Sequence, residues 1–273
     1  MSHAPGQRRL ALERQLGGDL PDPARLELVL VTDLDGTLLA GSRRSRRRFY
    51  RWLSLRRKRV LHVFSTGRHL RSVERLLSRE TALGLVSPHL VISDVGCTVA
   101  CGTTLQPLPL VVEPIEALWR GCDARVRPLL EGLRGLSAQP VAVERRLGYL
   151  IEPDRLDLSR LAAVEAHGVD CLISAGRYLD VLPLGVNKGS TLLNLLHWLE
   201  LDHDRVVTAG DSLNDLAMFQ TGLQGVVVGN AEPQLLAAVQ ELPGIHLARA
   251  HGCAGIVEGL RQFGFAPLLE GYL

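Results

Sequence analysis

The stretch Val29-Leu30-Val31-Thr32-Asp33-Leu34-Asp35-Gly36-Thr37 determines our prediction of the fold. It continues an apolar run that starts at Leu28, and such a short, branched, uncharged run is typical of a strand buried on both faces of a parallel sheet. Asp33 and Asp35 follow at once, and Gly36 then allows a sharp turn that Thr37 can cap. Because open α/β sheets hold ligands at the carboxyl ends of their strands, we expect a functional site here.

The spacing of the two aspartates suggests phosphate chemistry. Side chains at i and i+2 of a strand point to the same side, with Cα atoms about 6–7 Å apart. One carboxylate could attack phosphorus and form an aspartyl-phosphate, while the second serves as general acid and then as general base. Two unpaired carboxylates repel each other, so a divalent cation is expected between them and a phosphate. Alone, the same residues would equally fit a turn with two solvated acids.

The composition bounds the class of protein. The 273 residues are 46% hydrophobic and 22% charged, which is enough for one large domain or for a core with a smaller insert. The net charge of +2 does not by itself imply nucleic-acid binding. The five cysteines contain no Cys-x-x-Cys pair and fit buried free thiols in a reducing compartment. We find no signal peptide and no apolar stretch approaching the roughly 18 residues of a membrane span, so we expect a soluble, cytoplasmic protein.

Three segments are expected along the chain. Residues 1–27 are polar and contain several Pro and Gly residues, so we interpret them as a loose tail that could hold a short helix. Residues 28–98 and 183–273 would form an α/β core with a Rossmann-like parallel sheet. Residues 99–182 change character and are predicted to form an inserted α+β module.

Within the insert, short apolar segments alternate with expected helices. The segments expected as strands are Pro140–Val143, Gly148–Ile151, Cys171–Ser174 and Tyr178–Leu182, and the expected helices are Pro114–Leu133 and Leu158–His167. Several polar residues in or beside the insert are candidates for substrate contact, although each could equally be an ordinary surface or turn residue: Asp94, Arg145, Arg146, Tyr149, Ser174 and Arg177.

An arginine-rich helix is predicted over residues 43–59, with an apolar face formed by Phe49, Trp52, Leu53 and Leu55. A basic helix raises the hypothesis of nucleic-acid or membrane-surface binding. The surrounding acids leave the chain nearly neutral, so we favour a solvated surface helix.

A second apolar strand, Val60–Phe64, ends in Ser65-Thr66-Gly67-Arg68. A hydroxyl and a backbone amide near a helix start can hold a phosphate oxygen, although Ser-Thr-Gly could also be a plain helix cap. For Arg68 we favour pairing with a neighbouring acid or a place at the rim of the site.

Two further segments complete the pattern. Lys188 stands at the start of a helix expected to run to Leu199, where an ammonium opposes the helix macrodipole, and such a violation of a local rule tends to mark function. A buried strand over 205–209 ends in Gly210-Asp211-Ser212-Leu213-Asn214-Asp215. With a helix starting near Ser212, Asp211 and Asp215 could face one cation, and hard oxygen ligands suit Mg²⁺. Singly, each aspartate would also fit a helix cap.

The ordered set of Asp33-Leu34-Asp35-Gly36-Thr37, Ser65-Thr66-Gly67-Arg68, Lys188 and Gly210–Asp215 resembles the four-motif signature of the haloacid-dehalogenase superfamily, over about residues 28–270. The insert resembles the type IIB cap of Cof-type and sucrose-phosphate phosphatases. Within that subclass, Ile92–Gly96 and Ser174–Pro183 look most like sucrose-phosphate phosphatase and its glycosyl-phosphate relatives. The segment Gly96-Cys97-Thr98 departs from that pattern, which leaves the sugar open.

The resemblance implies a role for each motif residue. Asp33 would attack phosphorus, Asp35 would protonate the leaving oxygen and then activate water, and Lys188 would offset negative charge. The implied substrate-binding residues are Thr66, Gly67, Lys188 and Asn214. The implied Mg²⁺ ligands are Asp33, Asp35 through its carbonyl, Asp211 and, in support, Asp215.

The resemblance also implies that the protein is a Mg²⁺-dependent phosphatase acting on a phosphorylated sugar or glycoside. Sucrose 6-phosphate is the first candidate substrate. Mannosylfructose or glucosylglycerol phosphate, or a broad range of sugar phosphates, are alternatives. A non-catalytic relative that binds sugar phosphate and regulates a synthase is a further alternative. We expect a small-molecule substrate, no nucleic-acid or membrane partner, and a monomer or weak dimer.

Overall fold

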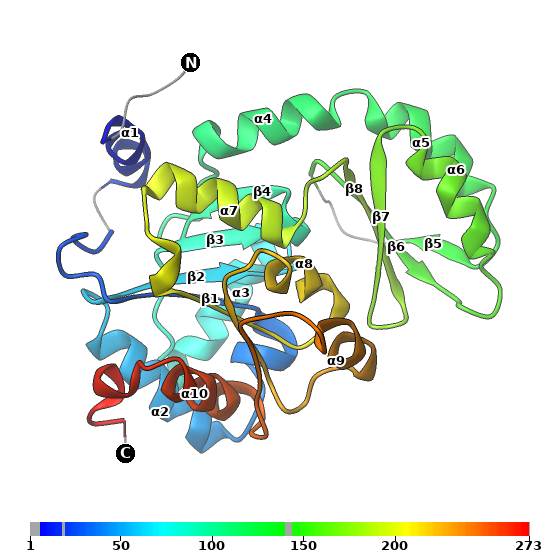
Figure 1. The fold of residues 1–273 in the computed structure, drawn as a ribbon. Helices are drawn as coiled ribbons and strands as arrows, with labels where there is room; N and C mark the ends of the chain where they lie inside the picture. Colours follow the sequence, from blue (N-terminus) through cyan, green and yellow to red (C-terminus); the bar gives the residue numbers. More distant parts are fainter. Residues whose placement is uncertain (1–5, 18–19, 140–143, 273) are drawn as a thin grey trace.

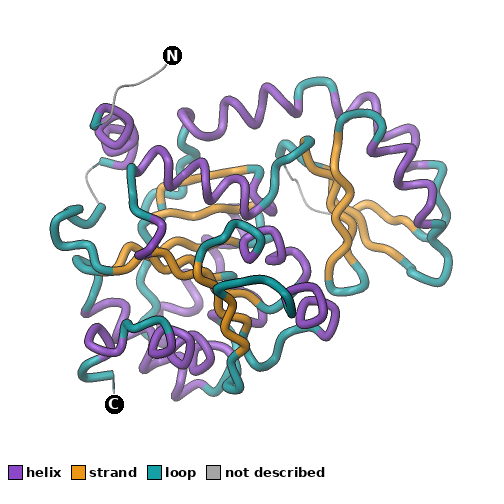
Figure 2. Tube along the Cα trace, viewed as in Figure 1, coloured by secondary structure: helices purple, strands orange, loops and turns teal. Residues whose placement is uncertain are grey.

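The computed structural model describes residues 6–17, 20–139 and 144–272 and contains two sheets (Figure 1, Figure 2). The larger sheet has seven strands in the order β11-β10-β9-β1-β2-β3-β4. These strands are β1 Leu28–Thr32, β2 Val60–Ser65, β3 Leu90–Ser93, β4 Thr98–Cys101, β9 Val206–Gly210, β10 Gln224–Val227 and β11 Ile245–Leu247. All neighbours run parallel except β4, which pairs antiparallel with β3 at the edge.

Strand β1 lies at the centre of the larger sheet. It pairs with β2 on one side and with β9 on the other, and all five of its residues are buried. The chain passes from β1 to β2 and β3 on one side and continues with β9 to β11 on the other, so the strand order reverses at β1. Ligands of open α/β sheets bind at such a point. The predicted fold class, a Rossmann-like core with an insert, is confirmed.

Helices cover both faces of the larger sheet (Figure 1). One face packs against α2 Arg43–Leu55, α3 Leu70–Glu80 and α10 Gly252–Gln262. The other packs against α1 Gln7–Leu16, α7 Lys188–Leu199 and the start of α4 Pro109–Trp119. Helices α8 Leu216–Phe219 and α9 Pro233–Val239 pack against β10 in a smaller cluster. In the described parts of the chain, no helix is long and apolar enough to cross a membrane. All five cysteines are free thiols, as predicted.

The described part of the N-terminal segment contains the short helix that we allowed for within residues 1–27. This helix is α1, and its Leu12 and Leu16 are buried against α7, so it is packed on the core rather than loose. Leu26 is buried in the same cluster. These leucines are too widely spaced to stand out among the polar residues around them, so burial of apolar area, rather than a visible sequence pattern, orders the segment.

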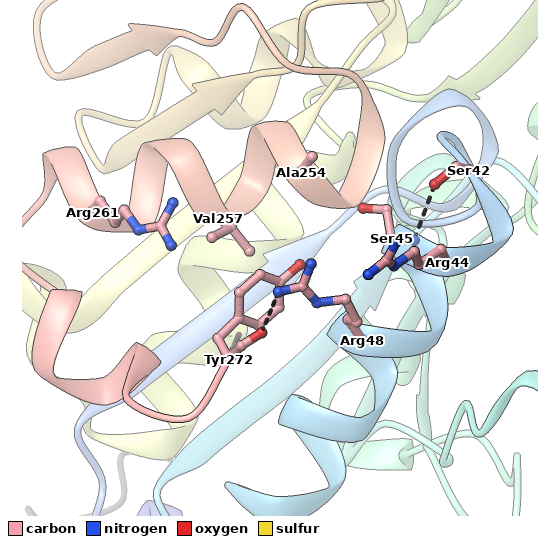
Figure 3. Close-up of a pocket in the computed structure, with 8 residues that line it drawn as sticks. All are labelled: Ser42, Arg44, Ser45, Arg48, Ala254, Val257, Arg261 and Tyr272. Carbon is pink, nitrogen blue, oxygen red and sulfur yellow. Dashed lines mark hydrogen bonds between the residues drawn. The ribbon is translucent and has the colours of Figure 1, made fainter.

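The arginine-rich helix α2 is tied to the C-terminal segment. The Arg48 guanidinium lies 5.2 Å from the centre of the Tyr272 ring and donates to the Tyr272 carbonyl, while Ser42 caps the helix (Figure 3). Further arginines of the predicted basic segment bind acids or carbonyls within the fold: Arg46 to Glu80, Arg56 to Leu268 and Glu270, Arg57 to Ser87, and Arg59 to Glu27. These contacts tie the basic segment to the fold, and two of its arginines, Arg46 and Arg59, form ion pairs with acids.

The smaller sheet has four antiparallel strands in the order β5-β6-β8-β7. Its elements are β5 Leu136–Ala138, β6 Leu147–Ile151, β7 Val169–Ser174, β8 Tyr178–Pro183, α5 Cys122–Glu131 and α6 Leu161–Glu165. Apolar side chains of α5 and α6 cover one face of this sheet. The strand expected at Pro140–Val143 lies outside the described residues.

Two details of the insert differ from the prediction. Strand β4 extends the larger sheet to Cys101, so the predicted boundary between residues 98 and 99 falls inside a strand. The single helix expected over Pro114–Leu133 is two helices, because the chain breaks at Arg120 and Gly121, where Gly121 adopts a φ of 76°.

Candidate active site

The carboxyl ends of β1, β2 and β9 and the start of α7 meet at one edge of the larger sheet. Asp33 follows β1, Thr66 and Gly67 follow β2, and Asp211 follows β9. The Asp33 amide donates to the Ala209 carbonyl at 2.9 Å, which extends the β1–β9 pairing to the end of the strand. The topology therefore gathers residues that are far apart in the sequence, as the repeated pattern of strand and polar turn predicted.

Lys188 connects three of these segments. Its side chain is fully buried, and its ammonium donates to Asp33 Oδ1 at 2.7 Å, Asn214 Oδ1 at 2.6 Å and Asp215 Oδ1 at 2.6 Å. Burial lowers the pKa of this ammonium, but the carboxylates of Asp215 and Asp33 outweigh that effect and raise the pKa above its ordinary value. Lys188 is therefore charged, and it compensates the acids around it.

Two aspartates of the loop after β9 fix its conformation through hydrogen bonds. Asp215 is fully buried, and its Oδ2 accepts hydrogen bonds from the amides of Asp211 at 2.9 Å and Ser212 at 3.1 Å. Asp211 in turn accepts a 2.7 Å hydrogen bond from Thr37 Oγ1. A Cβ on Gly36, which has a φ of 82°, would lie 2.0 Å from Asp211 Oδ2, so glycine is required there.

Three carboxylates gather tightly enough to hold a cation. Asp33, Asp211 and Asp215 each place one oxygen within 4.8 Å of the others. Burial, followed by repulsion from Asp215, raises the pKa of Asp211 to about 7, and burial is also the main cause that raises the pKa of Asp33. Lys188 offsets only one of the three negative charges, and the ligands are hard oxygens. This donor set fits a divalent cation such as Mg²⁺.

Asp35 lies apart from that cluster. Its side chain is more than half exposed, and its two oxygens accept hydrogen bonds from Arg68 Nε and Nη2, both at 2.6 Å. The structure thus brings Asp35 to the site but turns its carboxylate toward Arg68. We predicted for Arg68 either pairing with an acid or a place at the rim of the site, and the structure shows the pairing.

Thr66 and Gly67 line the same cavity as Asp33. Thr66 is buried, its Oγ1 accepts from the Arg68 amide at 3.2 Å, and its own amide donates to the Ile92 carbonyl. A Cβ on Gly67 would make only ordinary van der Waals contacts, with Val95 at 3.7 Å and Asn214 at 3.9 Å. Hydrogen bonds therefore fix the shape of this loop, which borders that cavity.

A cavity of about 640 Å³ lies between the two sheets and above these residues. Its core-side wall includes Asp33, Asp35, Thr66, Gly67, Arg68, Asp211 and Asn214. Its cap-side wall is formed mostly by polar residues, namely Gln139, Arg146, Ser174, Tyr178 and Asp180, together with Ala175. Lys188 and Asp215 are buried beneath this cavity rather than in its wall.

The polar candidates of the insert are therefore divided. Arg146 and Ser174 line the cavity, whereas Tyr149 is buried in the core of the insert and Arg145 donates to Cys97 and Thr98. Arg177 stacks on the Tyr178 ring at 5.0 Å.

Sequence reasoning missed Tyr178 and Asp180, although a signal was present. Leu179 and Val181 alternate with them along β8 and pack into the core of the insert. Period-two alternation therefore places Tyr178 and Asp180 on the opposite face, toward the cavity.

Comparison with known proteins identifies relatives that are phosphatases. A profile of the family described as sucrose-6F-phosphate phosphohydrolase matches residues 26–264. A mannosylfructose-phosphate phosphatase from Agrobacterium fabrum is 31% identical over 254 residues, which cover 90% of this chain and 99% of that protein. A glucosylglycerol-phosphate synthase from Pseudomonas anguilliseptica is 42% identical over 239 residues, 87% of this chain. The matched part is only 31% of that longer protein.

Among solved structures, the sucrose-phosphatase from Synechocystis sp. PCC6803, in complex with sucrose and phosphate, superimposes with a TM-score of 0.78. The match covers 87% of this chain and 98% of that one, at 23% sequence identity. At this identity the likeness establishes the fold alone, including the presence of the smaller α+β unit.

Proposed function

The chain belongs to the sucrose-6F-phosphate phosphohydrolase family of haloacid-dehalogenase-type phosphatases, and from this premise we propose that it hydrolyses the phosphate ester of a glycoside with the help of Mg²⁺. The observation that carries the proposal is the gathering of Asp33 and Asp211 in the wall of a cavity, with Lys188 and Asp215 buried behind them and mostly polar residues on the opposite wall. Such a cavity can hold a phosphoryl group at its floor and hydroxyl groups at its roof.

Asp33 is the proposed nucleophile. Its Oδ1 is fixed by Lys188, and the side chain borders the cavity, so an oxygen can face phosphorus in a constant position. The carboxylate would form a bond to phosphorus while the bond to the sugar oxygen breaks, and water would then release phosphate from Asp33.

Asp35 is the proposed acid and base. A carboxylate that accepts two hydrogen bonds from Arg68 cannot donate a proton, so this role requires Asp35 to leave Arg68. A phosphate carries more negative charge than a carboxylate and is a strong partner for a guanidinium. We therefore expect the substrate phosphate to replace Asp35 at Arg68, which frees Asp35 to protonate the leaving oxygen.

Asp33 and Asp211 would hold Mg²⁺, with Asp215 behind them. Because both oxygens of Asp215 already accept hydrogen bonds, we propose that it orients Asp211 and Lys188 more than it binds the ion. The bound ion would supply charge neutralisation for the phosphoryl group. Thr66, Gly67 and Asn214 would contact the phosphoryl oxygens from the other side of the site.

Two substrates are the leading candidates. Sucrose 6-phosphate follows from the family match, and the insert would act as the cap that selects it. Glucosylglycerol phosphate is favoured by a different observation, the 42% identity to part of a glucosylglycerol-phosphate synthase. Both are glycosides whose non-phosphorylated unit could contact the polar side chains of the cap.

The experiment measures release of inorganic phosphate, with Mg²⁺, from sucrose 6-phosphate, glucosylglycerol phosphate, mannosylfructose phosphate and fructose 6-phosphate. We expect kcat/KM for one of the glycoside phosphates to exceed that for the monosaccharide phosphate at least about tenfold. Asp33→Asn should release no phosphate while keeping its fold. Binding of a glycoside phosphate without any release from the wild type would instead support the non-catalytic, regulatory alternative.

A further inference from the structure

A buried guanidinium connects the cap to the core. Arg146 precedes β6, and only 3% of its side chain is exposed. Nε donates to Asp94 Oδ1 at 3.2 Å, Nη2 donates to the Gly67 carbonyl at 3.1 Å, and Nη1 donates to Asp180 Oδ1. Asp180 belongs to the cap, whereas Asp94 and Gly67 belong to the core, so one side chain bridges the two units.

The charges of this cluster make the bridge difficult to break. Two buried carboxylates share a single guanidinium, and burial raises the pKa of Asp94 to about 6 although Arg146 opposes the shift. Burial likewise raises the pKa of Asp180, again against Arg146. Without Arg146, both carboxylates would be buried and without their main compensating charge, which is strongly unfavourable.

The core residues that Arg146 contacts, Asp94 and Gly67, belong to segments that form the site. The turn that contains Asp94 and Val95 holds the loop after β2, because the Asp94 amide donates to the Arg68 carbonyl at 3.0 Å and the Val95 amide to the Thr66 carbonyl at 3.1 Å. Val95 is β-branched and has a φ of 57°, a strained conformation that only its surroundings can maintain.

The same turn reaches the helix that carries Lys188. Thr191 Oγ1 donates to the Gly96 carbonyl at 2.8 Å, and a Cβ on Gly96 would lie 2.4 Å from the Asn187 carbonyl. The position of the cap is therefore linked through Arg146 both to the phosphate-binding loop and to the start of α7.

We propose that Arg146 is a positioning residue that couples the cap to the phosphate-binding loop and thereby sets the preference for glycoside phosphates over small phosphate esters. The proposal rests on the proposed function. A glycoside phosphate requires a fixed distance between the two walls of the cavity, because its phosphate would contact Gly67 while its second unit contacts the cap. A small ester such as 4-nitrophenyl phosphate depends mainly on the core-side wall.

The test compares wild type with Arg146→Met in steady-state kinetics. For the glycoside phosphate that the wild type hydrolyses best, we expect KM to rise by about 10–100-fold, as expected when buried charged hydrogen bonds are lost. For 4-nitrophenyl phosphate, kcat/KM should change less than about threefold. The control is Arg127→Gln, which removes a cap arginine whose partner, Asp123, is half exposed. A merely structural role would lower kcat/KM for both substrates alike, and that result, or no change for either, overturns the proposal.

A second readout does not depend on the substrate. Hydrogen exchange of the backbone amides of residues 66–68 should speed up in Arg146→Met and stay unchanged in Arg127→Gln. If the wild type hydrolyses no glycoside phosphate, the proposed function is wrong. If hydrogen exchange of residues 66–68 is the same in Arg146→Met as in the wild type, the coupling between cap and loop is wrong as well. Should Arg146→Met not fold, Arg146→Met with Asp94→Asn and Asp180→Asn removes all three charges together and is measured in the same way.

Discussion

Lys188 shows how one side chain can organise a site. Its ammonium lies at the N-terminus of α7, where the macrodipole disfavours a cation, and three oxygens from two separate loops compensate for that position. The chain contains only one other lysine, Lys58. A buried cation with three acceptors both stabilises the fold and fixes the carboxylate that we propose as the nucleophile.

Lys188→Met should therefore destabilise the protein and abolish phosphate release. Removing one partner of a buried ion pair typically costs about 3–5 kcal/mol, because the remaining carboxylates lose their compensating charge. Urea unfolding in EDTA measures this loss. Lys58→Met, which removes the exposed lysine, is the control and should change the free energy of unfolding by less than about 0.5 kcal/mol. Equal stability of the two variants would contradict this account of Lys188.

At the residue scale, a functional residue could be predicted from the sequence where its type is unfavourable for its position in a helix or at a strand end. Lys188 lies at a helix start that disfavours a cation, and Asp33 and Asp35 follow a buried strand, so these three residues stood out. Arg146 was only one of several polar candidates, because its partners are 34, 52 and 79 residues away and nothing local distinguishes it from Arg145. Only the folded arrangement of cap and core reveals which arginine is buried.

Strand β2 carries a buried, neutral histidine. His62 lies with Nε2 3.0 Å from Thr32 Oγ1 on β1, and its amide donates to His89 Nδ1. Burial, followed by repulsion from His89 and Arg57, lowers the pKa of His62 to about 3. Below about pH 6.5 the unfolded chain binds a proton at this histidine and the folded chain does not. The free energy of unfolding of the protein therefore decreases as the pH falls.

Between pH 7 and pH 5, His62 should account for about 2 kcal/mol of lost stability. His62→Gln, which can keep a hydrogen bond to Thr32, should lose correspondingly less over the same interval. Urea unfolding of both proteins at the two pH values, in EDTA, gives the difference. Equal losses would show that His62 does not contribute to the acid sensitivity of the sheet.

The first turn of α7 packs closely against α8. A Cβ on Gly189 would lie 2.0 Å from the Ala217 carbonyl oxygen. Alanine is about 1 kcal/mol better than glycine in a helix interior, but overpacking a close contact costs about 1–3 kcal/mol. We expect Gly189→Ala to be destabilised in urea unfolding and to lose activity, since the shift displaces Lys188. His197→Ala, at an exposed position on the same helix, is the control; a more stable Gly189→Ala would contradict the close packing.

At the element scale, strands were easier to predict than the helices of the insert. The strands of the core are short, uniformly apolar runs, and β1, β2 and β9 lie close to where that pattern placed them. The helix expected over residues 114–133 is broken because Gly121 takes a positive φ, and the burial of α1 depends on α7, more than a hundred residues later. Gly121 is a local signal that the single-helix prediction overlooked, whereas the burial of α1 is not visible in any local pattern.

The molecule as a whole combines a sheet that presents acids with an insert that presents polar side chains. The gathering of the motif residues at one edge of the larger sheet could be predicted, because three segments repeat a buried strand followed by a polar turn, after β1, β2 and β9. The comparisons confirm the family that the order of the motifs suggested. The shape of the cavity and the residues of its cap-side wall could not be predicted, because they depend on how two separately folded sheets face each other.

Divalent cations should stabilise the whole molecule. Asp33 and Asp211 are held close together with raised pKa values, so an ion that binds only the folded site relieves their repulsion. At a Mg²⁺ concentration a hundred times the Kd, binding adds about 2.7 kcal/mol, and we expect the Tm to rise by about 5–10 °C relative to EDTA. The rise should vanish in Asp211→Ala. An equal rise in that variant would place the ion elsewhere.

The most direct test of the central claim is to locate the phosphoryl group on the protein during turnover. Asp35→Asn should hydrolyse the aspartyl-phosphate about 10²–10⁴-fold more slowly, whereas 4-nitrophenyl phosphate, whose leaving group needs little protonation, can still transfer its phosphoryl group. We therefore propose to quench this variant in acid after mixing with 4-nitrophenyl phosphate and Mg²⁺, and to map its peptides by mass spectrometry. The account predicts a phosphoryl group on Asp33. A phosphoryl group on another residue, or wild-type release of 4-nitrophenol by Asp33→Asn, would contradict it.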